Sequence, residues 1–309
     1  MFYGGTVFMG GWIVRAVSTH YVQNLGMYIT QMVMILAGPP IYAAAEYNIL
    51  GRLMHYLPMH AVLNPSRVFI FYITLGGAVE ALTGVGAGQA VPATPGTSRY
   101  VAGGTLMAVA LLLQACIEIS FIVMVAIIHR RCLRTGMLSP NIRTVCYTLY
   151  GTSTLILARC IFRAVETFLS YGPQCEEYHC GAIAKNEWFI YVFEAAPMVL
   201  YTYWLNLFHP GRFLPIEHRR YLDPDGETER IGPGWIDYRS KSQRFLDPFD
   251  FKGARSGRSD ESKFWLRPEN WPKCEDGSFA LGTATNIGKS ARLGKQKNAR
   301  SGSAQTSPA

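Results

Sequence analysis

Three charged side chains interrupt a long apolar stretch in the middle of the chain: Arg159, Arg163 and Glu166. Their spacing along the sequence would place them on one face of a helix. A charged side chain at the centre of a bilayer costs about 2.5–3.5 kcal/mol on insertion scales, so we do not expect this face to contact lipid. We expect it to face the inside of a helix bundle, where the charges could pair with acids or solvate a charged headgroup.

Acidic partners for the two arginines lie on other apolar segments. When depth is counted from the outer end of each segment, at about 1.5 Å per residue, Arg163 matches Glu194 and Arg159 matches Glu80. Glu166 lies one turn from Arg163 and could share it. These pairs could line a transport path, because ionisable groups inside a membrane are functional candidates. Alternatively, they could only fix the packing of the helices.

Further polar groups in the apolar half are weaker candidates. Glu118 shares a helical face with Gln114 and could extend a polar path toward the cytosol, or it could simply bond a neighbouring hydroxyl group. Glu46 lies near the cytoplasmic end of the second apolar segment. Arg15 ends the first segment and could reach lipid headgroups while its aliphatic stem stays in the membrane.

The sequence contains no recognisable catalytic or metal-binding pattern. The histidines form no zinc-binding spacing, and neither a nucleophile elbow nor a P-loop occurs. The cysteines show no metal-ligand spacing. Cys175 and Cys180 lie close together and could form a disulfide in an oxidising compartment, or remain free thiols. We therefore expect neither an enzyme nor a bound cofactor or metal.

The composition divides the chain into an apolar body and a polar tail. Of its 309 residues, 49% are hydrophobic and 16% are charged, whereas a soluble domain has about 25% charged residues. Residues 1–209 hold 11 Lys and Arg, 8 Glu and no Asp, and residues 210–309 hold 18 basic and 13 acidic residues. The positive charges form no dense stripe, so the net charge of +8 favours anionic lipid over nucleic acid as a partner.

Six apolar segments reach or approach the length that a membrane helix needs. Their approximate bounds are 2–17, 25–50, 68–91, 101–128, 144–171 and 187–208. The first has no basic region before it and no clear small-residue cleavage site, so we do not interpret it as a signal peptide. The expected fold class is all-α, a polytopic bundle of transmembrane helices.

The basic residues between the segments predict the orientation of the bundle. Segment 129–143 holds four arginines and no acid, and segment 52–67 begins and ends with arginine. By the positive-inside rule these segments and the C-terminal tail are cytoplasmic. Six spans then place the N-terminus inside as well. We expect the plasma membrane as the location, with an internal membrane as the alternative.

Four motifs together resemble one membrane family. The second segment contains the pattern Q…P…AA..Y...GR, beginning at Gln31, and the third reads VEALTGVGAG. The fifth contains R-x-x-x-R-x-x-E, and the sixth reads NEWFIYVFEAAPM followed by HPG. In this combination, over about residues 8–250, the chain resembles the fungal RTA-like proteins, also called the lipid-translocating exporter family. The resemblance adds Gln31 to the candidate site residues.

The resemblance implies a seven-helix membrane protein, linked to stress or drug resistance, that moves amphiphilic lipids such as sphingoid bases, sterol-like compounds or phospholipids. The segment Gly11-Trp12-Ile13-Val14-Arg15 is similar to the end of the second helix of that family. Phe8 stands where relatives tend to carry Glu. We therefore expect this chain to lack the first of the seven helices, which agrees with an inside N-terminus.

The apolar body is expected to end at His209-Pro210-Gly211, because Pro and Gly stop a helix. The expected organisation is a transmembrane bundle over residues 1–211, a cytosolic membrane-proximal tail over 212–277 and a disordered tail over 278–309. Residues 212–277 show no helical period, which favours a largely irregular, surface-associated segment over a small folded domain.

Two functions are compatible with buried charges in a bundle of membrane helices. In the first, a translocator of amphiphilic lipids uses the buried charges to solvate a headgroup, and its partners are membrane lipids and an amphiphilic lipid substrate. In the second, a non-transporting membrane sensor uses the same charges as a two-state lock and signals through its tail. A lateral opening beside Arg159 and Arg163 would favour lipid passage, and a sealed, fully paired core would favour the sensor. No oligomeric state is indicated.

Overall fold

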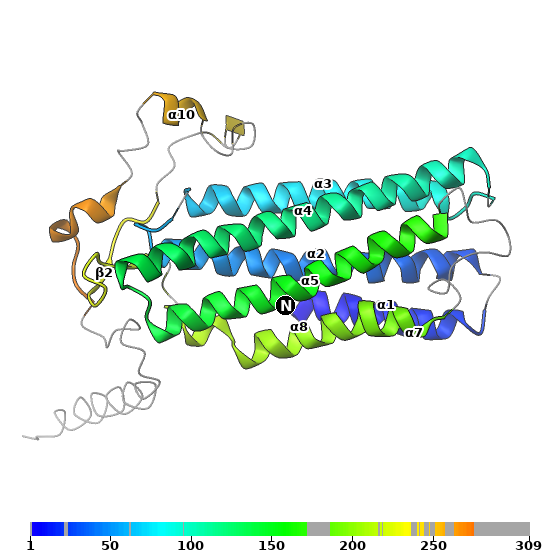
Figure 1. Ribbon diagram of the computed structural model, residues 1–309, viewed down its shortest axis with the longest axis horizontal. Coiled ribbons are helices and arrows are strands. Elements are labelled where there is room, and N and C mark those ends of the chain that lie inside the picture. Colours follow the sequence, from blue (N-terminus) through cyan, green and yellow to red (C-terminus); the bar gives the residue numbers. More distant parts are fainter. Residues whose placement is uncertain are drawn as a thin grey trace, which may run out of the picture.

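The computed structural model shows a long bundle of helices with a small β-hairpin at one end (Figure 1). Its long helices are α1 (Phe2–Ser18), α2 (Leu25–Tyr56), α3 (Pro65–Ala90), α4 (Ser98–Thr135) and α5 (Pro140–Tyr171). They coincide with the first five apolar segments of the sequence, although α2 and α4 extend further at their C-terminal ends. The structure describes residues 2–21, 24–61, 63–94, 96–171, 186–215, 217, 219–235, 240, 242–243, 247, 251–256 and 263–274.

The sixth apolar segment forms one helical rod made of three pieces. These are α7 (Trp188–Ile190), the π-helical turn η1 (Tyr191–Ala195) and α8 (Ala196–Leu207). Each long helix packs against the next one in the sequence, and α8 packs against α5. In Figure 1, α3 and α4 form one long side of the bundle, α1 and α8 the other, and α2 and α5 run between them.

Short polar residues and one glycine set the ends of these helices. Asn24 accepts hydrogen bonds from the first amides of α2, and Asn64 does the same for α3, whose first residue is Pro65. Thr97 caps α4 at its start, and Gly136 ends α4 in the left-handed conformation with φ of 71°. Such caps satisfy amides and carbonyls that have no partner within the helix.

The bundle has the surface of a membrane protein. Four helical stretches are long and apolar enough to cross a bilayer: Gly26–Tyr56, Pro65–Ala90, Ser98–Thr135 and Pro140–Tyr171. Large apolar side chains cover their outward faces, such as Val33, Leu113, Ile119, Val123 and Phe168. Apolar side chains on the outside are stable only against lipid or another apolar surface. The predicted fold class, an all-α bundle that spans the membrane, is confirmed.

The tail contains more regular structure than its composition suggested. After the 3-10 turn η2 (Pro210–Arg212), strands β1 (Arg220–Leu222) and β2 (Glu229–Ile231) pair antiparallel. The remaining short helices are α10 (Phe251–Arg255), η4 (Phe264–Leu266) and η5 (Pro268–Asn270).

The hairpin docks both on the segment around η4 and on the bundle. Tyr221 packs edge-on against Phe264, with ring centroids 5.1 Å apart. Tyr56, at the end of α2, donates a hydrogen bond of 2.7 Å to Glu229. Three-residue strands are too short to show an alternating hydrophobic pattern in the sequence. Phe264, which packs on Tyr221, follows about forty residues later. This is why the small folded unit was not expected.

Two expectations lie outside the described residues. The first is the pair Cys175 and Cys180, and the second is disorder over residues 278–309.

Candidate functional site

Helix α5 and the turn η1 bring four charged side chains together inside the bundle. Arg159 donates from Nε to Oε1 of Glu194 at 2.9 Å. Arg163 donates from Nη1 to Oε2 of Glu166 at 2.6 Å, and its Nε lies 3.4 Å from Oε2 of Glu194. Arg159 is 1% exposed and Glu194 is 0% exposed. Two arginines and two glutamates therefore form a neutral, buried ion-pair cluster.

Local backbone structure places each member of the ion-pair cluster. The spacing of Arg159, Arg163 and Glu166 puts them on one face of α5, as the sequence predicted. Glu194 belongs to the π-helical turn η1, where one extra residue per turn changes the direction of the side chains that follow. Phe162 and Phe193 stack beside the cluster at 4.9 Å and hold η1 against α5.

The structure contains one of the two ion pairs inferred from depth. Arg163 lies against Glu194 as expected, but Arg159 also pairs with Glu194 rather than with Glu80. The expectation of an Arg159–Glu80 pair was therefore wrong. Helix α3, which carries Glu80, packs mainly on α2 and α4, whereas η1 and α8 pack directly on α5. Arg159 and Glu80 are near enough for the charge of Arg159 to act on Glu80, but the ion pair of Arg159 is with Glu194.

A second pair of acids lies deeper in the bundle, on α2 and α4. Glu46 accepts a hydrogen bond of 2.7 Å from the Ser153 hydroxyl, and Glu118 accepts one of 3.2 Å from the Tyr47 hydroxyl. Both glutamates are 0% exposed. Glu118 thus bonds a neighbouring hydroxyl, which is one of the two alternatives that the sequence left open.

Gln31 and Arg15 lie apart from both groups of charges. Gln31 is buried and accepts a hydrogen bond of 2.7 Å from Ser18, which ties α2 to α1. Arg15 lies 3.6 Å from Glu187 and 5.9 Å from the centre of the Trp12 ring. Both residues hold α1 in place, and neither joins the ion-pair cluster.

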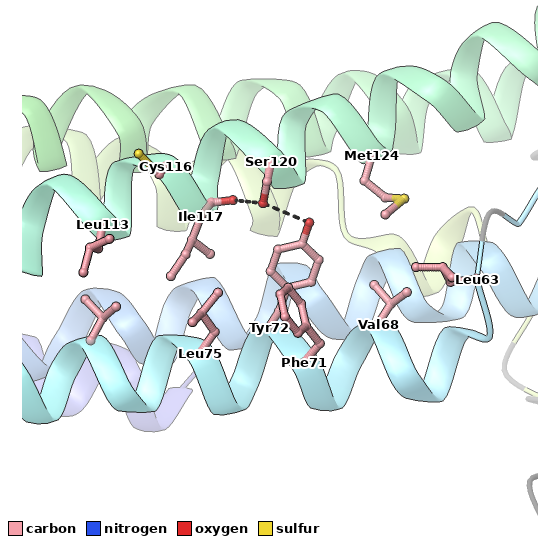
Figure 2. A pocket seen from close by; sticks show the side chains of 11 residues that line it. Leu63, Val68, Phe71, Tyr72, Leu75, Leu113, Cys116, Ile117, Ser120 and Met124 are labelled. Atoms are coloured by element: carbon pink, nitrogen blue, oxygen red, sulfur yellow. Dashed lines mark hydrogen bonds between the residues drawn. The ribbon is translucent and has the colours of Figure 1, made fainter. Parts of the chain in front are cut away.

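A cavity of about 440 Å³ lies between α3 and α4. Figure 2 shows side chains of the two helices pointing toward one another across it. The wall is apolar except for the hydroxyls of Tyr72 and Ser120, which are 3.2 Å apart. Leu75 and Leu113 line the cavity and are also exposed, so it opens on the outer, lipid-facing side of the bundle. The lining residues are Leu63, Val68, Phe71, Tyr72, Leu75, Val79, Leu113, Cys116, Ile117, Ser120 and Met124.

Two stacked tyrosines connect the cavity to the buried acids. Tyr72, in the cavity wall, stacks on Tyr47 with ring centroids 4.9 Å apart. The hydroxyl of Tyr47 is the donor to Glu118. A route of three side chains therefore runs from the lipid-facing cavity to a carboxyl group in the core.

The model of the family described as RTA1 like protein matches residues 1–217 of this chain. The chain belongs to the RTA1-like family.

Two similar relatives are both named lipid-translocating exporter-like protein RTA1. The chain is 35% identical over 218 residues to that of Leptosphaeria maculans, which covers 68% of this chain and 42% of the relative. It is 32% identical over 262 residues to that of Ajellomyces capsulatus, which covers 80% of this chain and 77% of the relative. The chain thus spans less than half the length of the first relative.

Another relative carries a different name. The chain is 32% identical over 197 residues to protoporphyrin uptake protein 1 of Saccharomyces cerevisiae, which covers 62% of this chain and 61% of that protein. No solved structure matches the chain.

In this RTA1-like protein the opening and the ion-pair cluster lie on different helices. The cavity is formed by α3 and α4, whereas Arg159 and Arg163 are sealed between α5 and η1. The opening is thus not beside the arginines, the position that was to distinguish lipid passage from a sealed core. Among the described residues, no three His, Cys, Asp or Glu side chains lie close enough together to hold a metal ion.

Several residues around the buried acids of this RTA1-like protein were not predicted from the sequence as parts of a site. Glu46 was noted without a role, and Tyr47, Tyr72 and Ser153 were not considered as its surroundings. A signal was present for Glu46, because an acid in an apolar run needs a partner. Nothing in the sequence indicated Ser153 as that partner, since it lies 107 residues away.

Proposed function

We propose that this protein moves an amphiphilic lipid across the membrane, with the aliphatic part of the lipid in the cavity between α3 and α4. The observation that carries the proposal is the cavity itself, an apolar hollow on the lipid-facing side that is linked to a buried carboxyl group by Tyr72 and Tyr47. An amphiphile needs an apolar surface and a polar group at once, and this arrangement offers both.

The chemistry of the cavity supports an aliphatic occupant. Its volume of about 440 Å³ falls within the range of about 300–1,000 Å³ that is usual for ligand pockets. Its two hydroxyl groups bond to one another, and Ser120 also donates to the carbonyl of Ile117 at 2.7 Å. A polar ligand would have to compete for these bonds, whereas an aliphatic chain would not.

The names of the relatives agree with this chemistry. Those from Leptosphaeria maculans and Ajellomyces capsulatus are called lipid-translocating exporter-like proteins. The relative called protoporphyrin uptake protein 1 is named after a large, largely apolar ring compound. None of these names refers to an enzyme, and we propose no catalytic role, cofactor or nucleic-acid partner for this chain.

The two sets of buried charges then have different roles. Arg159, Arg163, Glu166 and Glu194 form a closed, neutral cluster that fixes α5 against η1. Glu118 is buried and is linked to the cavity wall through Tyr47 and Tyr72, so the polar part of a lipid would reach it when these tyrosines move. This assignment moves the proposed path of the headgroup away from the arginines and toward the acids.

We propose six membrane spans with both termini in the cytoplasm. Residues 1–211 would form the bundle and residues 212–277 the membrane-proximal tail, with the plasma membrane as its location. The arginine-rich junction between α4 and α5 lies at the same end of the bundle as the hairpin (Figure 1). Arginines at one end of a bundle mark the cytoplasmic side.

A second function, sensing without transport, is supported by the docking of the tail. Glu229 of the hairpin accepts a hydrogen bond from Tyr56, and the carbonyl of Pro215 accepts one of 2.8 Å from Arg52. A conformational change in α2 would therefore be transmitted to the tail through these two hydrogen bonds. The sealed ion-pair cluster fits this reading as well.

Lipid movement in liposomes separates the two functions. The purified chain would be reconstituted with a fluorescent long-chain base or phospholipid, and its appearance in the opposite leaflet would be measured. Cys116→Trp places a large ring in the cavity, and Ile119→Trp is the matched control, since Ile119 is exposed on α4 but does not line the cavity. We expect at least a fivefold loss of flux for Cys116→Trp only.

Two results would contradict the proposal of lipid transport through this cavity. One is a wild-type flux equal to that of protein-free liposomes. The other is an equal flux for Cys116→Trp and the wild type, which would remove the cavity from the path. A wild type without flux, together with loss of a cellular response when the tail is deleted, would favour the sensor.

A further inference from the structure

Glu46 and Glu118 are carboxyl groups in the core of the bundle, each with one oxygen that has no partner. Ser153 donates to Oε2 of Glu46, and Tyr47 donates to Oε1 of Glu118. The other two oxygens, Oε1 of Glu46 and Oε2 of Glu118, are buried without a hydrogen bond. Buried polar atoms are nearly always bonded, so two such atoms on neighbouring acids need an explanation.

No cation compensates these acids within the described part of the chain. The nearby guanidinium group of Arg159 is committed to Glu194, and neither Glu46 nor Glu118 has a salt bridge there. The two carboxyl groups are close enough for their charges to act on each other.

The other ionisable groups around the pair carry no positive charge. They are Tyr47 on α2, Tyr72 on α3, Cys160 on α5 and Tyr201 on α8. Each of them is neutral in its ordinary state, and each can become only an anion. The surroundings of the pair therefore offer no positive charge, only hydroxyl groups: those of Ser153, Thr152 and Tyr201 beside Glu46 and that of Tyr47 beside Glu118.

Two ionised carboxylates are poorly stabilised in such a place. An isolated buried carboxylate is costly, and a second one beside it adds repulsion. Protonation of one carboxyl group removes one of the two charges and, with it, the repulsion between them. A single added proton thus leaves one buried charge instead of two.

We propose that Glu46 and Glu118 form a proton-binding site, and that movement of lipid through the adjacent cavity is coupled to its loading. A proton from water adds to one carboxylate oxygen, where an O–H bond forms and the carboxylate becomes neutral. Release breaks that bond and returns the proton to water. No other bond changes, and no oxidant or reductant is involved.

Tyr47 is the physical link between this site and the cavity. Its ring stacks on Tyr72 in the cavity wall, and its hydroxyl is the donor to Glu118. An occupant that displaces Tyr72 would move Tyr47 and weaken that bond. Because loss of a donor favours the neutral carboxyl over the carboxylate, filling the cavity would promote proton uptake. This coupling rests on the proposed function, whereas proton binding by the two acids does not.

Infrared spectroscopy of the full chain in lipid nanodiscs tests the proton site. A neutral carboxyl group gives a carbonyl stretching band that a carboxylate lacks and that shifts in heavy water. We expect this band in the wild type at pH 7, and we expect it to be clearly weaker in the double variant Glu46→Gln/Glu118→Gln. Glu187→Gln is the control, since Glu187 is 67% exposed, and it should leave the band unchanged.

The wild type alone can overturn the site, even if the glutamine variants fail to fold. Absence of a neutral-carboxyl band at pH 7 would mean that both acids are ionised, and the proposal would be wrong. A band of equal strength in the wild type and in the double variant would assign the proton elsewhere, with the same consequence. The proposal would also be wrong if the band disappeared on addition of sodium chloride, because the two acids would then bind a metal cation in place of a proton.

Flux measurements test the coupling separately. In liposomes with a pH difference of one unit, we expect wild-type lipid flux to change at least threefold and Glu118→Gln flux to be insensitive to the gradient. Equal gradient dependence in both proteins would overturn the coupling. Absence of flux in the wild type would contradict the proposed function instead, and the infrared band would still decide the proton site.

Discussion

Arg159 donates from Nε to Glu194 at 2.9 Å, across the contact between α5 and the π-helical turn η1. Neither side chain reaches the surface of the bundle. Glu194 also faces Arg163, so one carboxylate holds two guanidinium groups from successive turns of α5. Glu194 therefore joins η1 to two successive turns of α5.

Replacement of Glu194 by Gln should destabilise the protein strongly. It leaves Arg159 as a buried cation without its ion-pair partner, and breaking a buried ion pair on one side costs about 3–5 kcal/mol. We expect a large fall in the melting temperature of the purified protein in detergent, measured by tryptophan fluorescence. Glu187→Gln serves as the control, because Glu187 is 67% exposed and its ion pair with Arg15, at 3.6 Å, lies at the surface. Equal melting temperatures for the two variants would refute a central role for Glu194.

The docking of the tail on α2 makes a second prediction. Tyr56→Phe removes the 2.7 Å hydrogen bond to Glu229, which is itself almost fully buried. Loss of one partner of a buried hydrogen bond costs about 1–3 kcal/mol. We expect faster cleavage of the tail by added protease, with the bundle itself still protected. Tyr203→Phe is the matched control, since Tyr203 is 73% exposed. An unchanged cleavage rate for Tyr56→Phe would show that the hairpin is held by other contacts.

The long helices could be predicted because each corresponds to a continuous apolar run in the sequence. Apolar runs gave the helices, and the spacing of Arg159, Arg163 and Glu166 gave their common face. Depth counting found the Arg163–Glu194 contact because the α5 and η1 segments are neighbours. It chose the wrong ion-pair partner for Arg159, because a sequence does not state which of two acids comes within hydrogen-bond reach.

The remaining features depend on contacts between distant residues. The bond between Ser153 and Glu46 joins residues 107 positions apart, and that between Tyr56 and Glu229 joins residues 173 positions apart. The cavity exists because α3 and α4 present apolar side chains that do not fill the space between them. Packing of this kind is decided by the shapes of side chains in three dimensions, and no one-dimensional pattern records it.

Acid should destabilise the end of the bundle where α2 meets α3, through His60. This ring is 5% exposed, and its Nε2 lies 3.4 Å from the sulfur of Met137. Burial and the nearby charge of Arg131 lower the pKa of His60 from its ordinary value. The unfolded chain therefore binds a proton at a higher pH than the folded protein does. The stability that neutral His60 contributes is present above about pH 6.5 and is lost as the pH falls below that value.

The measurement is the melting temperature of the purified protein between pH 7.5 and pH 5. We expect His60→Gln to flatten the decline on the acidic side, because glutamine has no proton to gain. His20→Gln, at an exposed position between α1 and α2, is the control and should follow the wild type. If His60→Gln declined as steeply as the wild type, the acid sensitivity would belong to other groups.

Tyr47→Phe tests the link between the cavity and the buried acids. The change keeps the ring that stacks on Tyr72 and removes only the hydroxyl that donates to Glu118. Glu118 then loses its donor, so its ionised form is stabilised less and its neutral form is favoured. We expect a stronger neutral-carboxyl infrared band at pH 7, a stability loss of about 1–3 kcal/mol and a lipid flux with weaker dependence on the pH gradient. Tyr203→Phe should change none of the three. An unaltered band in Tyr47→Phe, in a protein that folds normally, would mean that this hydroxyl does not control the protonation of the pair, and the cavity and the acids would have to be treated as independent.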